Sequence, residues 1–174
     1  RAGWLDETGH PAHDLIHDAV LDAMSWQTEA TLHGRAAALL EASGAEATED
    51  LVAIGTHLES HLEALRSNGE TGSDASHVAE HASDLLTSAG WRMVARGGHD
   101  AGTNLLGRAA SLRRTFGLPS VEPEIEHALA LVESGQMSEA RQRLRSIDHD
   151  AVEQDPRLRA YAGVVDSALT LYSA

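Results

Sequence analysis

The stretch LLTSAGWRMVARGGHDAGTNLLGRAASL, residues Leu85–Leu112, predicts two helices around a glycine-rich turn. Small and apolar residues recur on one face of each half at helical spacing. Gly97 and Gly98 form the break between the halves. Because small residues let two helices approach closely, the stretch is typical of a helical hairpin that buries its faces by stacking. The face residues are Leu86, Ala89, Gly90 and Met93 in the first half, and Gly102, Leu106 and Ala109 in the second.

The same pattern returns 38 residues further along the chain. Gly90, Met93, Gly97, Gly102, Leu106 and Ala109 correspond to Ala128, Leu131, Gly135, Ala140, Leu144 and Ile147. A third copy begins with Ala162 and Val165, 34 residues after Ala128 and Leu131. From about Val78 to its end, the chain resembles the tetratricopeptide repeat, whose period is about 34 residues. The resemblance implies a right-handed α-solenoid; the alternative is an irregular helical bundle.

The composition predicts an all-α protein. Of the 174 residues, 42% are hydrophobic but only 3% are aromatic, so a core must consist mostly of alanine, leucine and valine. Alanine and leucine favour helix because they lose little side-chain freedom there. The length fits one compact domain or one short solenoid.

The charge excludes two classes of partner. The net charge is −14, and all thirteen basic residues are arginine. Such a surface repels a phosphate backbone and an anionic membrane, so we expect no direct binding to nucleic acid or membrane. Cysteines are absent, and the sequence shows neither a signal peptide nor an apolar run of membrane-spanning length. We therefore expect a cytoplasmic protein, and the start at Arg1 suggests a piece of a longer one.

Turn residues and helix signals divide the chain into three parts. We expect residues 1–11 to be the remnant of a preceding domain, 12–70 to be a helical linker or the solenoid start, and 71–174 to hold tetratricopeptide-like hairpins. Ser25, Thr48 and Ser138 are candidate N-caps. Pro123 is expected at the first helical position. The expected helices cover about 12–24, 26–44, 48–68, 75–96, 100–116, 123–134, 138–148 and 156–172, with Leu32, Ala36, Leu39 and Leu40 as the apolar face of the second.

A second resemblance covers residues 11–112. The segments HDLIHDAV (13–20), LHGRAAALLE (32–41), IGTHLESHL (54–62) and NLLGRAA (104–110) are similar, in order and spacing, to segments of signal-transduction ATPases with numerous domains. In those proteins the helical region lies downstream of the nucleotide-binding module, in adenylate/guanylate cyclase-like proteins and large LuxR-type regulators. The resemblance implies a helical region of a signalling ATPase or transcription regulator.

Catalytic motifs are missing from the sequence. A phosphate-binding loop needs lysine, which the chain lacks, so we expect no nucleotide site, no cofactor and no catalytic residue. Glu122, Glu124 and Glu126 should favour the dipole at a helix start rather than form an acid–base pair.

Histidine is the one unusual residue type, with eleven copies. Three pairs have the i, i+4 spacing that places two imidazoles on one helical face, where they could contact one metal ion. A site needs a third ligand, which the sequence does not place, so we assign no metal and expect solvated or capping histidines. The pairs are His13 and His17, His57 and His61, and His77 and His81.

The expected function is a non-catalytic protein-interaction or sensor region that binds a protein or peptide, such as another domain of its own parent chain. Arg92, Met93 and Arg96 are the candidate partner-binding residues on a concave face; the alternative is that the arginines pair with nearby carboxylates. Trp91 is expected to face the preceding helices.

Two other functions remain open: a small-molecule sensor, and a metal-dependent enzyme built on the histidine pairs. Peptide binding predicts an open groove lined by the first helix of each hairpin. Small-molecule sensing predicts an enclosed pocket. The enzyme predicts three or more histidines or carboxylates that converge on one point.

Overall fold

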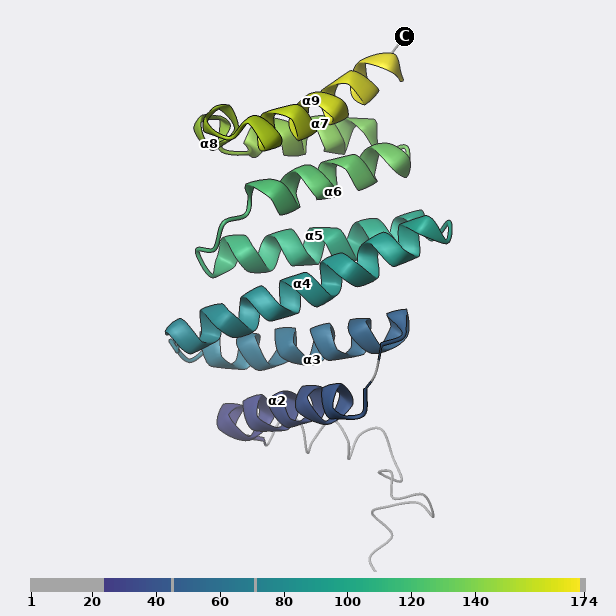
Figure 1. Cartoon of the computed structure of the whole chain (residues 1–174). Coiled ribbons are helices and arrows are strands. Elements are labelled where there is room, and N and C mark those ends of the chain that lie inside the picture. Colours follow the sequence, from purple (N-terminus) through teal and green to yellow (C-terminus); the bar gives the residue numbers. More distant parts are fainter. Residues whose placement is uncertain (1–23, 45, 71, 173–174) are drawn as a thin grey trace, which may run out of the picture.

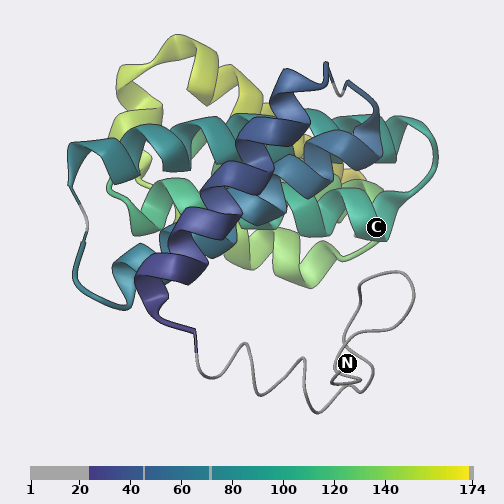
Figure 2. The same cartoon turned by 90° about the horizontal axis from the view of Figure 1, so that it is seen from below.

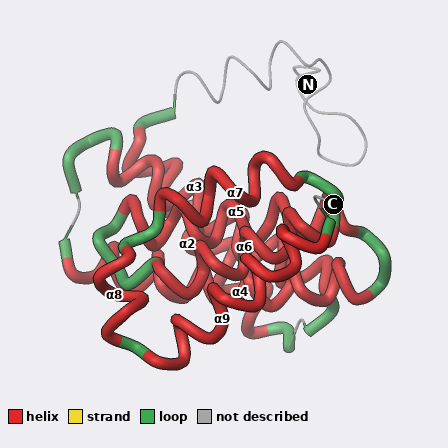
Figure 3. The backbone as a smooth tube through the Cα atoms, turned by 90° about the horizontal axis from the view of Figure 1, so that it is seen from above, coloured by secondary structure: helices red, strands yellow, loops and turns green. Residues whose placement is uncertain are grey.

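A computed structural model describes residues 24–44, 46–70 and 72–172 (Figure 1). All regular secondary structure in these residues is helical, as the composition predicts (Figure 3). The helix expected over 12–24 and the remnant expected over 1–11 lie outside the described residues. None of the described helices has the length and apolar character of a membrane span. The helices are α2 (Trp26–Ala42), α3 (Thr48–Arg66), α4 (Ser73–Ala95), α5 (His99–Thr115), α6 (Val121–Glu133), α7 (Met137–Ser146), α8 (His149–Gln154) and α9 (Pro156–Leu171).

The helices are stacked in chain order. Each of α2 to α6 packs against the next helix, and α9 contacts α6, α7 and α8. Figure 1 shows this order from α2 at one end to α9 at the other, and Figure 2 shows α2 lying across the end of the stack. The packing of α3 on α4 continues across residue 70, where we placed a boundary between two parts.

Two turns 38 residues apart have the same geometry. Gly97, after α4, has φ +85°, and Gly135, after α6, has φ +79°, a conformation that L side chains rarely adopt. The next residue in each turn donates its N–H to a carbonyl of the last helical turn: Gly98 to Met93 at 2.9 Å, and Gln136 to Leu131 at 2.8 Å. The turn between α4 and α5 and the turn between α6 and α7 therefore have the same backbone geometry.

Alanine and glycine set the distance between helices in the core. Where α4 packs on α5, Gly90 and Gly102 face each other and neither has room for a side chain. Leu106 packs over Gly90. The buried core of the described residues contains no phenylalanine, tyrosine or tryptophan. The residues with no exposed surface include Ala79, Ala82, Leu86, Ala89, Ala109, Ile125, Ala128, Ala140 and Val165.

The face that α2 buries differs from our expectation. Leu32 is 49% exposed and Leu39 is 70% exposed, whereas Ala30 and Ala37 are buried. The small side chains let α2 lie close to α3, where the carbonyl of Ala30 hydrogen-bonds His61 Nδ1 at 2.7 Å. The close approach of α2 to α3 and the hydrogen bond of Ala30 therefore decide which face of α2 is buried, although Leu32 and Leu39 are larger and more apolar.

Several helix boundaries also differ from the predicted ones. Ser25 is the N-cap of α2, as predicted, and accepts the N–H of Thr28. Thr48 is instead the first residue of α3 and is buried. Pro123 is the third residue of α6, and Ser138 lies inside α7. The short helix α8 was not predicted; Asp148 caps it by accepting the N–H of Ala151.

Candidate functional site: a groove along α4, α6 and α9

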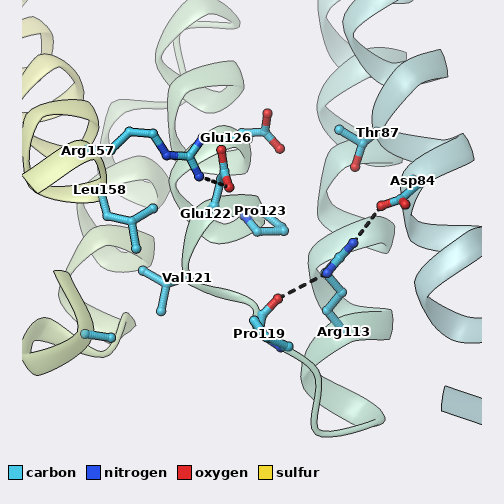
Figure 4. Close-up of a pocket in the computed structure, with 11 residues that line it drawn as sticks. Asp84, Thr87, Arg113, Pro119, Val121, Glu122, Pro123, Glu126, Arg157 and Leu158 are labelled. Atoms are coloured by element: carbon cyan, nitrogen blue, oxygen red, sulfur yellow. Dashed lines mark hydrogen bonds and ion pairs between the residues drawn. The ribbon is translucent and has the colours of Figure 1, made fainter. Parts of the chain in front are cut away.

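A groove of about 430 Å³ is lined by residues of α4, α6 and α9 (Figure 4). We call it the α4–α6–α9 groove. α4 contributes Asp84 and Thr87, and α9 contributes Arg157 and Leu158. α6 lies between them, and the α5–α6 connection closes one side. The remaining lining residues are Arg113, Pro119, Val121, Glu122, Pro123, Glu126 and Ala151.

Both guanidinium groups of the groove are held by carboxylates. Arg113 donates to Asp84 Oδ1 at 2.6 Å and to the hydroxyl of Ser83 at 3.0 Å. Arg157 donates to Glu122 Oε2 at 2.6 Å. Such exposed pairs contribute little to stability, but they orient the two arginines and neutralise their charge.

The third carboxylate of the groove, Glu126, has no cationic partner within ion-pair distance among the described residues. It lies on the α4 side of α6, where its Oε1 accepts the indole N–H of Trp91 at 3.2 Å. Burial raises the pKa of Glu126 above its usual value, and the neighbouring Glu122 raises it further. The bond from Trp91 and the charges of Arg113 and Arg157 lower the pKa without offsetting the burial. An incompletely compensated carboxylate therefore faces the groove.

Tyr161 of α9 adds a hydroxyl close to these acids. Burial, followed by the negative charges of Glu126 and Glu122, raises the pKa of Tyr161 to about 12. Its phenol therefore stays protonated at neutral pH and can donate a hydrogen bond.

A second, more polar cavity of about 490 Å³ lies between α5, α6 and α7. His127 of α6 is buried in its wall, and Gly107 leaves room for the ring: a Cβ on Gly107 would lie 3.0 Å from His127 Cε1. Burial, with the nearby charges of Arg143 and Arg114, lowers the pKa of His127 to about 4. The imidazole is therefore neutral at pH 7.

Glu124 beside this cavity lies in the first turn of α6, as expected from the sequence, and has a second role that the sequence did not indicate. It is buried and ion-paired to both Arg114 and Arg143, the latter at 3.3 Å. Glu124 therefore serves a tertiary ion-pair cluster between three helices as well as lying in the first turn of α6.

The two candidate histidine pairs within the described residues have separate partners. His57 Nδ1 lies 2.9 Å from His33 Nδ1, whereas His61 bonds to the carbonyl of Ala30. His81 pairs with Glu41 at 2.5 Å, and His77 is exposed. His13 and His17 lie outside the described residues. In the described part of the chain, no group of three or more histidines or acids is placed to hold a metal ion.

His33 is the histidine that the sequence pattern missed. Burial, and then the facing His57, lower its pKa. Since its partner lies 24 positions away on α3, helical spacing within one segment gives no signal for this pair.

The predicted partner-binding residues lie away from the α4–α6–α9 groove. Arg92 donates to the carbonyl of Glu46 in the α2–α3 connection at 2.7 Å. Met93 packs against the α4–α5 core, and Arg96 is the exposed C-cap of α4. None of the three lines the α4–α6–α9 groove. Their role in partner binding stays a prediction.

Trp91 contradicts our expectation directly. It reaches forward to Glu126 on α6 instead of facing the preceding helices. The groove residues on α6 and α9 were not predicted as a site either, because only their charge pattern was visible in the sequence. Comparison with known protein families, curated proteins and solved structures gives no match.

Proposed function

We propose that this chain is a non-catalytic protein-interaction region, a right-handed α-solenoid of tetratricopeptide-like hairpins that binds a peptide segment in its α4–α6–α9 groove. One observation carries the proposal: α4 and α6, the first helices of two successive hairpins, line the same groove together with α9, whose Ala162 and Val165 correspond in sequence to Ala128 and Leu131 of α6. Stacked hairpins use such a surface, extended over several repeats, for binding.

The form of the groove favours a peptide over a small molecule. Small-molecule pockets usually enclose most of their ligand. Here the walls face solvent, since the side chains of Asp84 and Arg157 are 64% and 69% exposed. Between these walls lie Val121, Pro123 and Leu158, which offer apolar contact to peptide side chains.

The proposal extends to the parent protein. The similarity of residues 11–112 to signal-transduction ATPases supports a place in a cytoplasmic bacterial signalling ATPase or transcription regulator. Its partner is then another protein or another segment of the same parent chain. The acidic composition, with a net charge of −14, supports a protein partner rather than nucleic acid or membrane.

The test uses a displayed library of random 12-residue peptides, followed by fluorescence anisotropy with the best binder. Leu158→Asp places a charge in the groove and should weaken binding about tenfold or more. Leu171→Asp is the matched control, because Leu171 lies on the same helix, is 78% exposed and does not line the groove. A library without binders, or equal effects of both variants, would refute the proposal.

The same peptide tests the surface predicted from the sequence. Arg92→Glu together with Arg96→Glu should leave the affinity unchanged if the peptide occupies the groove. A large loss in this variant, with none in Leu158→Asp, would move the binding surface to the C-terminal end of α4.

A further inference from the structure

The charges that line the α4–α6–α9 groove are unequally matched. Its three carboxylates are Asp84, Glu122 and Glu126, and its two guanidinium groups are Arg113 and Arg157. Asp84 and Glu122 each hold one arginine at 2.6 Å. Among the described residues, the one direct partner of the Glu126 carboxylate is a neutral donor, the Trp91 indole, while Arg113 and Arg157 act on it only through longer-range charge. Glu126 thus has capacity for a cation in direct contact.

We propose that the groove selects peptides carrying an arginine or lysine side chain whose cationic group binds the Glu126 carboxylate. This inference rests on the proposed function and names the chemistry of the partner. The positive charge of the peptide would form an ion pair with Glu126, as Arg113 does with Asp84 and Arg157 does with Glu122.

The geometry leaves Glu126 available for such a contact. Trp91 occupies Oε1, so Oε2 can accept a further hydrogen bond. Figure 4 shows Glu126 on the side of α6 that faces α4 and Thr87. Val121 and Leu158 lie in the same groove and can contact the aliphatic part of a long basic side chain. A charge-assisted hydrogen bond in this half-buried position is stronger than a neutral one.

Removing the charge of Glu126 should weaken the binding of a basic peptide but should not lower the stability of the fold. Burial disfavours the charged form of Glu126 in the free protein, and the nearby charges of Arg113 and Arg157 do not offset this effect. Glutamine keeps the oxygen that accepts the Trp91 N–H and removes the buried charge. Glu126→Gln should therefore fold at least as stably as the wild type at pH 7 while it binds a basic peptide less tightly.

The experiment uses the best-binding library peptide that Leu158→Asp weakens, and the same peptide with each arginine replaced by citrulline and each lysine by acetyl-lysine. Glu126→Gln should weaken the basic peptide about tenfold, and should change the affinity of the neutral peptide less than twofold. Glu133→Gln is the control: it removes an exposed charge from the same helix and should change either affinity less than twofold. Thermal unfolding should show no decrease in Tm for Glu126→Gln.

Three results would overturn the inference. The groove-binding peptides could lack basic residues, Glu126→Gln could bind the basic peptide as tightly as the wild type, or Glu133→Gln could weaken binding equally. The last result would assign the effect to the overall negative charge. In each case a retained effect of Leu158→Asp would leave the proposed function standing. If no peptide responds to Leu158→Asp, both proposals are refuted.

Discussion

Gly90 and Gly102 lie against each other where α4 packs on α5: a Cβ added to Gly102 would lie 2.7 Å from the carbonyl oxygen of Gly90. It would also lie 2.5 Å from Val94 Cγ2 and 3.0 Å from the backbone nitrogen of Val94. Backbone atoms cannot move aside without separating the helices. The distance between α4 and α5 therefore depends on having glycine, which has no side chain, at positions 90 and 102.

We expect Gly102→Ala to destabilise the protein by about 1–3 kcal/mol, the range for inserting a group into a packed core. The clash with backbone should exceed the gain of about 1 kcal/mol that alanine brings to a helix interior. Gly163→Ala is the matched control, since Gly163 is helical in α9 and a Cβ there has no neighbour within 4 Å. Urea denaturation should show Gly163→Ala stabilised; a Gly102→Ala variant as stable as the wild type would disprove the close contact.

Gly90→Leu and Ala128→Leu test the two corresponding hairpins. Both positions are buried at contacts with the following helix, and a leucine at either should cost about 1–3 kcal/mol. The measurement is the midpoint of chemical denaturation, with circular dichroism to confirm the helical content. An unchanged midpoint in both variants would show that the 38-residue correspondence is wrong.

His127 should make stability depend on pH. Its pKa is about 4 in the folded protein, below its ordinary value of 6.5, so the folded state disfavours the protonated imidazole. The contribution of the neutral His127 imidazole to the free energy of unfolding is fully present above about pH 6.5 and is lost as the pH falls toward 4. The free energy of unfolding of His127→Gln should therefore decrease less between pH 7 and pH 4.5 than that of the wild type.

His77→Gln serves as the control for this titration because His77 is exposed. Its free energy of unfolding should follow the wild type over the same pH range. Parallel curves for His127→Gln and the wild type would show that the buried imidazole does not contribute.

Asp155 should stabilise the groove through the start of α9. Its carboxylate accepts the N–H of Arg157 at 2.8 Å and that of Leu158 at 3.4 Å, the two residues that α9 places in the groove. Asp155→Ala should cost about 1 kcal/mol, as loss of an N-cap does. Asp155→Asn should retain most of this stability, and hydrogen exchange should show the loss confined to the first turn of α9 in Asp155→Ala.

Much of the local structure could be read from residue spacing. The glycines after α4 and α6, the cap at Ser25 and the small residues of the α4–α5 hairpin are all local signals, because backbone conformation and helical faces depend on nearby residues. Local signals did not predict which face of a helix is buried when that choice depends on packing against another helix. α2 buries Ala30 and Ala37 instead of Leu32 and Leu39, since close packing on α3 favours the small side chains.

The sequence by itself determined the helical class, the helix ends marked by glycine, and the absence of lysine that rules out a P-loop. Only the tertiary structure decided which charges meet. Trp91 and Glu126 are 35 positions apart and lie on different helices, yet they share a hydrogen bond. The stack also paired Arg113 with Asp84, whereas none of the described cations lies within ion-pair distance of Glu126. The register between helices, and not the spacing within one helix, determines which side chains come within a few ångströms.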